Sequence, residues 1–144
     1  MIYFDSTYIV KCDLAEPGTA EVLALAHSHP GRACASHGRL EFYSAVKRHL
    51  REQNLAAAEA HEVLHQFVRD DVQDLWSFLP VNHSLIEMAC MRLAALPEIV
   101  LCRAADALHL TCAAAIGFSA IYRNDRNLLA AAPYFGLEAL NVIG

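Results

Sequence analysis

The sequence predicts an α/β fold in which a central, mostly parallel sheet of about five strands is covered by helices on both faces. Short runs rich in β-branched and aromatic residues alternate along the chain with longer segments of helical periodicity. This alternation is typical of parallel sheets, because the chain needs a crossover, usually a helix, between successive parallel strands. With 144 residues, 56% of them hydrophobic, the chain has the size and composition of a single domain over residues 1–144.

Turn and capping residues between these runs set the expected elements. Strands are expected at 2–5, 33–36, 74–81, 119–122 and 138–142. Helices are expected at 6–13, 18–29, 38–51, 54–70, from Asn82 or Ser84 to about 95, 103–116 and 126–132. Ser6 or Thr7 is expected to cap the first of these helices, and Ser36 the third, because their hydroxyls can accept a free backbone N–H.

Four carboxylates stand near the expected carboxyl ends of strands or early in the following helices: Asp5, Glu41, Asp106 and Asp125. Ligand sites in parallel sheets lie beyond the carboxyl ends of the strands, so we expect the four acids to converge at one edge. Carboxylates gathered in one place repel one another unless a cation lies between them. The arrangement therefore predicts a site for a hard divalent ion, Mg²⁺ or Mn²⁺.

Polar and basic residues flank the four acids. Ser6, Thr7 and Asn124 are candidates to hold a metal-bound water or a carboxylate in place. The net charge of −5 excludes attraction of RNA or DNA by bulk electrostatics, so any nucleic acid must be met by a local basic rim. The candidates for this phosphate-binding rim are Arg39, Arg103, Arg123 and Arg126.

A competing motif occurs at His61-Glu62-Val63-Leu64-His65, which matches the H-E-x-x-H pattern of zinc peptidases, with Glu87 as a candidate third ligand. Helical periodicity argues against this alternative, because the expected buried stripe of the helix leaves both histidines on an exposed flank. A peptidase would also leave the four strand-end acids unexplained.

Four segments in order resemble the PIN-domain family, in particular the VapC-like toxins of bacterial toxin–antitoxin pairs. The D-A-L-H-L sequence of 106–110 is the most specific of them. The others are the opening I-Y-F-D-S-T of 2–7, the S-H-G-R-L-E-F of 36–42, and the N-D-R-N-L-L of 124–129 followed by Gly136-Leu137. The chain departs from the family pattern at Arg123, where many relatives carry Thr or Ser two residues before the last acid.

The resemblance implies a PIN-like α/β/α sandwich and a Mg²⁺- or Mn²⁺-dependent endoribonuclease that acts as a toxin. It also implies an RNA substrate, a homodimer and a cognate small antitoxin protein that blocks the acidic site. Carried over by motif, the four acids form the metal site, supported by Ser6 or Thr7 and by Asn124. A non-toxin RNA-processing nuclease and a non-catalytic PIN-like binding module remain as alternatives.

Composition also bears on the compartment. The sequence has no apolar run of about 18 residues and no basic leader, which favours a cytoplasmic protein without a membrane contact. Five cysteines without a C-x-x-C pair are typical of free thiols in a reducing compartment.

Overall fold

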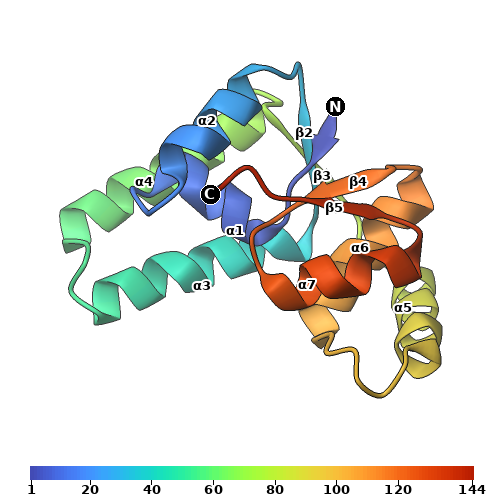
Figure 1. Ribbon diagram of the computed structural model, residues 1–144. Coiled ribbons are helices and arrows are strands. Elements are labelled where there is room, and N and C mark those ends of the chain that lie inside the picture. Colours follow the sequence, from blue (N-terminus) through green and yellow to red (C-terminus); the bar gives the residue numbers. More distant parts are fainter.

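The structure, a computed structural model, describes residues 1–144 as three layers with a sheet in the middle (Figure 1). The strands are β1 (Ile2–Tyr3), β2 (Arg32–Ala35), β3 (Trp76–Leu79), β4 (Ala120–Tyr122) and β5 (Glu138–Leu140). All paired strands are parallel, within β1–β2–β3 and within β4–β5. One bridge between Phe4 and Tyr122 joins the two parts. The order is therefore β3–β2–β1–β4–β5, and the predicted fold class is confirmed.

Seven α-helices and one 3₁₀-helix surround the sheet. They are α1 (Ser6–Asp13), α2 (Thr19–His27), α3 (His37–Arg51), α4 (Ala57–Val72), α5 (His83–Ala95), α6 (Ala104–Ile116), α7 (Arg126–Ala131) and η1 (Ala132–Phe135). None of these helices combines the length and the apolar character that a membrane span requires. The five cysteines are all free thiols.

Alternation along the first strand divides the core into two halves. Ile2 and Phe4 point to one face, where they pack with residues of α1, α2, α3 and α4. Tyr3 points to the other face and packs with residues of α5, α6, α7 and η1. Successive side chains of a strand point to opposite faces of the sheet, so a strand covered on both sides is apolar throughout. This explains why the first strand reads as a continuous apolar run.

Some predicted boundaries and caps differ from the structure. The strand expected at 74–81 is limited to Trp76–Leu79, and η1 was not expected. Asp5, rather than Ser6 or Thr7, caps α1, because its side chain accepts the Tyr8 N–H. Ser36 makes no cap for α3; its hydroxyl accepts the Val81 N–H at 3.2 Å. The capping role expected of Asn82 is confirmed by its bond with the Leu85 N–H.

The strand order reverses direction beside β1. After β1 the chain adds β2 and β3 on one side, then returns to place β4 and β5 on the other side. The carboxyl ends of β1 and β4 therefore lie next to each other where the order reverses, and the Asp5 N–H donates to the Tyr122 carbonyl at 3.3 Å. Such switch points are where parallel sheets bind ligands.

Candidate active site

Two of the predicted acids follow the two strands that meet at the switch point. Asp5 is fully buried, and its Oδ1 accepts the Thr7 hydroxyl at 2.7 Å and the Tyr8 N–H at 3.3 Å. Asp125 caps α7, and its Oδ1 accepts the N–H groups of Asn127 and Leu128. Each aspartate thus uses one oxygen to begin a helix. The second oxygen of each, Oδ2, is directed to the same partner, Arg123.

Arg123 joins three of the four acids through one buried guanidinium. Its Nε lies 2.7 Å from Asp5 Oδ2, its Nη1 lies 2.5 Å from Asp106 Oδ1, and its Nη2 lies 3.9 Å from Asp125 Oδ2. Only 8% of Arg123 is exposed, and Asp106 is buried as well. The convergence predicted for Asp5, Asp106 and Asp125 is therefore present in the structure, around a cation that the chain itself provides.

Burial and charge act in opposite directions on this cluster. Burial raises the pKa of Asp5, although the charges of Arg123 and His109 and the hydrogen bond from Thr7 act to lower it. Burial also acts to lower the pKa of Arg123, but the carboxylates of Asp5 and Asp106 outweigh it and raise that pKa. The guanidinium therefore stays charged.

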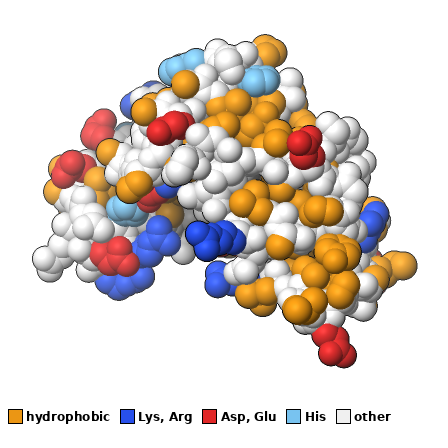
Figure 2. Space-filling model, in the orientation of Figure 1, with side chains coloured by type: hydrophobic (Ala, Val, Ile, Leu, Met, Phe, Trp, Pro, Cys, Tyr) orange, Lys and Arg blue, Asp and Glu red, His pale blue; other side chains and the backbone are white.

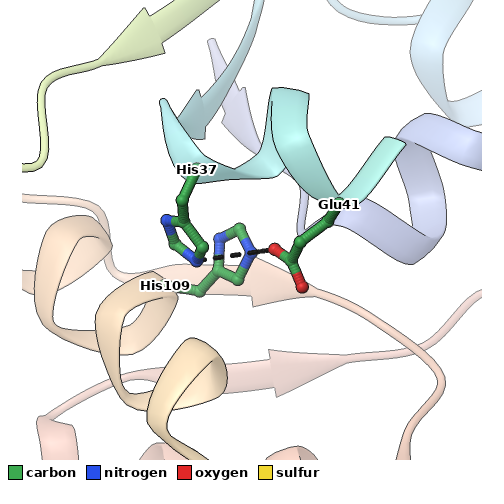
Figure 3. A group of neighbouring side chains, drawn as sticks. All are labelled: His37, Glu41 and His109. Atoms are coloured by element: carbon green, nitrogen blue, oxygen red, sulfur yellow. Dashed lines mark hydrogen bonds and ion pairs between the residues drawn. The ribbon is translucent and has the colours of Figure 1, made fainter. Parts of the chain in front are cut away.

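The fourth acid, Glu41, lies on α3 and has different partners. Its Oε1 lies 2.6 Å from Nε2 of the fully buried His109 on α6 and 3.4 Å from Nε2 of His37, one turn back on α3 (Figure 3). Burial acts to raise the pKa of Glu41, but the hydrogen bond and charge of His109 outweigh it, so the pKa is lowered. Burial and the neighbouring His109 lower the pKa of His37 to about 4.

Glu41 and Arg123 share the wall of an open cavity of about 330 Å³. The supporting residues predicted from the sequence, Ser6, Thr7 and Asn124, line the same cavity. Figure 2 shows Lys and Arg side chains gathered where the surface is hollowed between α3 and α7. The cavity thus places polar side chains and charges of both signs beside the switch point of the sheet.

The predicted arginine rim divides in the structure. Arg123 lines the cavity, but it is engaged with the acids. Arg39 pairs with Asp71 at 2.9 Å and lies over the Phe78 ring. Arg103 and Arg126 are exposed at the N-termini of α6 and α7 and line no described cavity.

Two basic residues of the cavity were missed by the sequence analysis. Lys11 and Arg48 both line it. Lys11 is buried and pairs with Glu16 at 2.9 Å, whereas Arg48 is exposed and makes no ion pair. Helical spacing is the signal that could have found Arg48, because it follows Glu41 by seven residues, two turns along one face of α3.

The H-E-x-x-H pair lies away from this site. His61 and His65 are exposed on α4, with their rings 4.1 Å apart. The one group of three metal-ligating side chains in the structure is His37, Glu41 and His109, so no third ligand approaches the α4 pair. The geometry of a zinc peptidase is therefore absent.

The acids at the switch point have the donor chemistry of a hard divalent ion. Asp5 Oδ2 is a buried oxygen that accepts no hydrogen bond, because the Arg123 Nε–H does not point at it despite the short distance. Carboxylate oxygens are the ligands that Mg²⁺ and Mn²⁺ prefer. Four acids and one guanidinium leave surplus negative charge, so the donor chemistry suits such an ion. Arg123 competes for the same carboxylates, and with it in place no three of these acids bring oxygens within 4.8 Å of one another.

Comparison with known proteins bears on the fold. No family model matches the sequence, and no curated protein is similar to it in sequence. Among solved structures, the chain is similar to VapC20 of Mycobacterium tuberculosis, a toxin that cleaves the sarcin–ricin loop. The TM-score is 0.72 over 91% of this chain and 95% of that one, with 16% sequence identity. The chain therefore has the PIN-like fold of VapC toxins, as the sequence motifs predicted.

Proposed function

We propose that this protein is a divalent-cation-dependent endoribonuclease that acts as the toxin of a toxin–antitoxin pair. The observation that carries the proposal is the convergence of Asp5, Asp106 and Asp125 around Arg123 at the switch point, with Glu41 on the wall of the adjoining cavity. The likeness to VapC20, a toxin that cleaves an RNA loop, supports the reaction class.

Asp5, Asp106 and Asp125 are the residues that would hold the ion, Mg²⁺ or Mn²⁺. A bound divalent ion at such a site supplies an activated water and neutralises the charge that develops on the phosphodiester. Around it, Thr7 fixes the orientation of the Asp5 carboxylate by its 2.7 Å hydrogen bond.

The cavity residues have separate roles in this proposal. Arg48 is exposed and free of any ion pair, so we assign it to contact an RNA phosphate. Asn124 is exposed in the same cavity and is assigned to the substrate side of the site. Glu41, which His109 holds in place, is assigned to orient the attacking water. The partners that follow from the proposal are RNA, a small antitoxin protein and a second copy of the chain.

The decisive experiment compares purified wild type with Asp106→Asn on total bacterial RNA, with Mn²⁺ or with a chelator, followed by mapping of new 5′ ends. We expect cleavage at defined ends by wild type with Mn²⁺ alone, and a loss of at least about 100-fold in Asp106→Asn. Asp71→Asn is the matched control, since this acid pairs with Arg39 outside the cavity. Cleavage by Asp106→Asn at the wild-type rate would contradict the site assignment.

The toxin part of the proposal needs its own measurement. Induced expression in bacteria is expected to arrest growth with wild type and not with Asp106→Asn. Specific cleavage in the test tube without growth arrest would favour a non-toxin RNA-processing nuclease.

One observation favours a second candidate, a non-catalytic PIN-like binding module. Arg123 already neutralises part of the charge that a metal would otherwise neutralise. In that case wild type and Asp106→Asn would retain RNA binding, and neither would cleave RNA with any divalent ion.

A further inference from the structure

A second group of ligating side chains lies beside the acids and is not engaged by Arg123. His37 and Glu41 stand one turn apart at the start of α3, and His109 faces them from α6 (Figure 3). One ligand atom from each of the three residues lies within 4.8 Å of the other two. Gly38 lets the start of α3 pack closely on β2, because a Cβ at that position would overlap Cys34 Sγ.

The donor set distinguishes this group from the carboxylate cluster. Two imidazoles and one carboxylate suit Zn²⁺ and neighbouring transition metals, whereas Mg²⁺ prefers oxygen ligands alone. An imidazole binds a metal through a ring nitrogen that carries no proton.

The distances between the ligand atoms are close to those around a bound ion. A tetrahedral ion about 2.1 Å from each ligand places neighbouring ligand atoms about 3.4 Å apart. His37 Nε2 lies 3.4 Å from Glu41 Oε1, and it also donates to the Ala105 carbonyl oxygen at 3.1 Å. The pair of His109 Nε2 and Glu41 Oε1, at 2.6 Å, is held by a hydrogen bond and opens by less than about 1 Å when an ion replaces the proton.

The outer contacts of His109 suit a metal ligand. Its Nδ1 lies 3.0 Å from the Tyr3 hydroxyl, which also accepts the Ala35 N–H at 2.9 Å. A hydroxyl both donates and accepts, so Tyr3 can accept the Nδ1–H of His109 when Nε2 binds a metal. Metal-binding histidines in proteins are generally held through their other ring nitrogen in this way.

Charge separates the two sites. Arg123 pairs with Asp5, Asp106 and Asp125, so an ion at the acids must displace a guanidinium. Glu41 is the one acid of the four without an arginine partner. An ion at Glu41 displaces the proton shared with His109, and the Nε2–H of His37 moves to Nδ1, which is buried without a hydrogen-bond partner.

We propose that His37, Glu41 and His109 bind one transition-metal ion of the zinc class, at a site separate from the acids that face Arg123. The proposal stands without the ribonuclease activity, because it concerns binding alone. If the protein is also a nuclease, an ion here engages Glu41 and so slows RNA cleavage.

The test titrates the metal-free protein with ZnCl₂ by calorimetry and with CoCl₂ by visible absorption. We expect one Zn²⁺ per chain, intense Co²⁺ bands of a tetrahedral site, and at least about tenfold weaker binding in His37→Gln and Glu41→Gln. His61→Gln is the matched control for adventitious binding at the exposed pair of α4. Asp106→Asn is the control for the acid cluster. Both are expected to bind Zn²⁺ as wild type does.

Three outcomes would overturn the proposal. They are no Zn²⁺ binding at millimolar metal, binding that survives both His37→Gln and Glu41→Gln, and binding that disappears in Asp106→Asn. Circular dichroism on each variant verifies that the fold is kept, and two variants on one site guard against the failure of either to fold. Because the readout is binding, its outcome is independent of whether wild type cleaves RNA.

Discussion

Helix α1 has an acid at each end, the fully buried Asp5 and the half-buried Asp13, and the two acids are in opposite situations. Asp5 at the N-terminus accepts two hydrogen bonds and faces Arg123. Asp13 is the last residue of α1, its Oδ2 is buried without a hydrogen-bond partner, and it shares a cavity with Asp70. The helix dipole favours a negative charge at the N-terminus and opposes one at the C-terminus. One helix therefore carries an acid whose charge is supported by an arginine and two hydrogen bonds, and an acid whose charge has little support.

The pKa shifts make the difference concrete. Burial raises the pKa of both acids, but at Asp5 it is opposed by Arg123, His109, Thr7 and the Tyr8 N–H. At Asp13 burial and the charge of Asp70 act together and raise the pKa to about 7, with Arg32 alone acting against them. Burial of a carboxylate therefore does not by itself mark a functional site. The partners of each carboxylate oxygen decide whether the buried charge is stabilised or is unfavourable.

Removing the cation at Asp5 gives the largest expected effect. Arg123→Met leaves Asp5 and Asp106 buried without their partner, and we expect a loss of about 3–5 kcal/mol in the free energy of unfolding at pH 7.5. Urea denaturation measures it, with the exposed Arg126→Met as a control expected within about 0.5 kcal/mol of wild type. The loss should shrink at pH 4, because protonation removes the unpaired charge. A loss below 1 kcal/mol at neutral pH would mean that Arg123 does not stabilise the acids.

Asp13→Asn should have an effect of opposite sign. The folded-state pKa of Asp13, about 7, lies above its ordinary value of 3.8, so the folded chain binds the proton more tightly than the unfolded chain. The contribution of Asp13 to stability therefore falls as pH rises from about 4 to about 7, then stays constant. We expect Asp13→Asn to raise the Tm at pH 8 by on the order of 5 °C and to leave it unchanged at pH 3.5. A lower Tm at pH 8 would show that Asp13 makes a favourable charged contact.

Arg123→Thr tests whether Arg123 competes with a metal ion for the acids. Threonine is small and uncharged, and it removes the guanidinium that competes for Asp5 and Asp106. We expect Mn²⁺ to bind about tenfold more tightly, which corresponds to about 1.4 kcal/mol. Calorimetry measures the affinity, and Mn²⁺ should raise the Tm of the variant more than that of wild type. Arg126→Thr is the matched control. An unchanged affinity for Mn²⁺ would show that Arg123 does not compete with the ion.

The sequence alone determined the order of elements and the two faces of the sheet. Apolar alternation at 2–4 and the small-residue helix around Asp106 carry their own burial pattern, because neighbours two, three or four residues apart share a face. Asp5 and Asp125 pointed to the candidate site because parallel strands end at one edge, whereas the D-A-L-H-L segment did so by its resemblance to the PIN-domain family. These are local patterns, and they survive in a single sequence.

Only the tertiary structure decided what each charged group contacts. Arg123 was expected at an RNA phosphate, but it joins three acids drawn from two strand ends and α6. His109 was not among the predicted site residues, yet it meets Glu41 across 68 residues of chain. Long, flexible side chains such as arginine reach several partners, and their choice depends on how separate elements pack. No periodicity within one element records that choice.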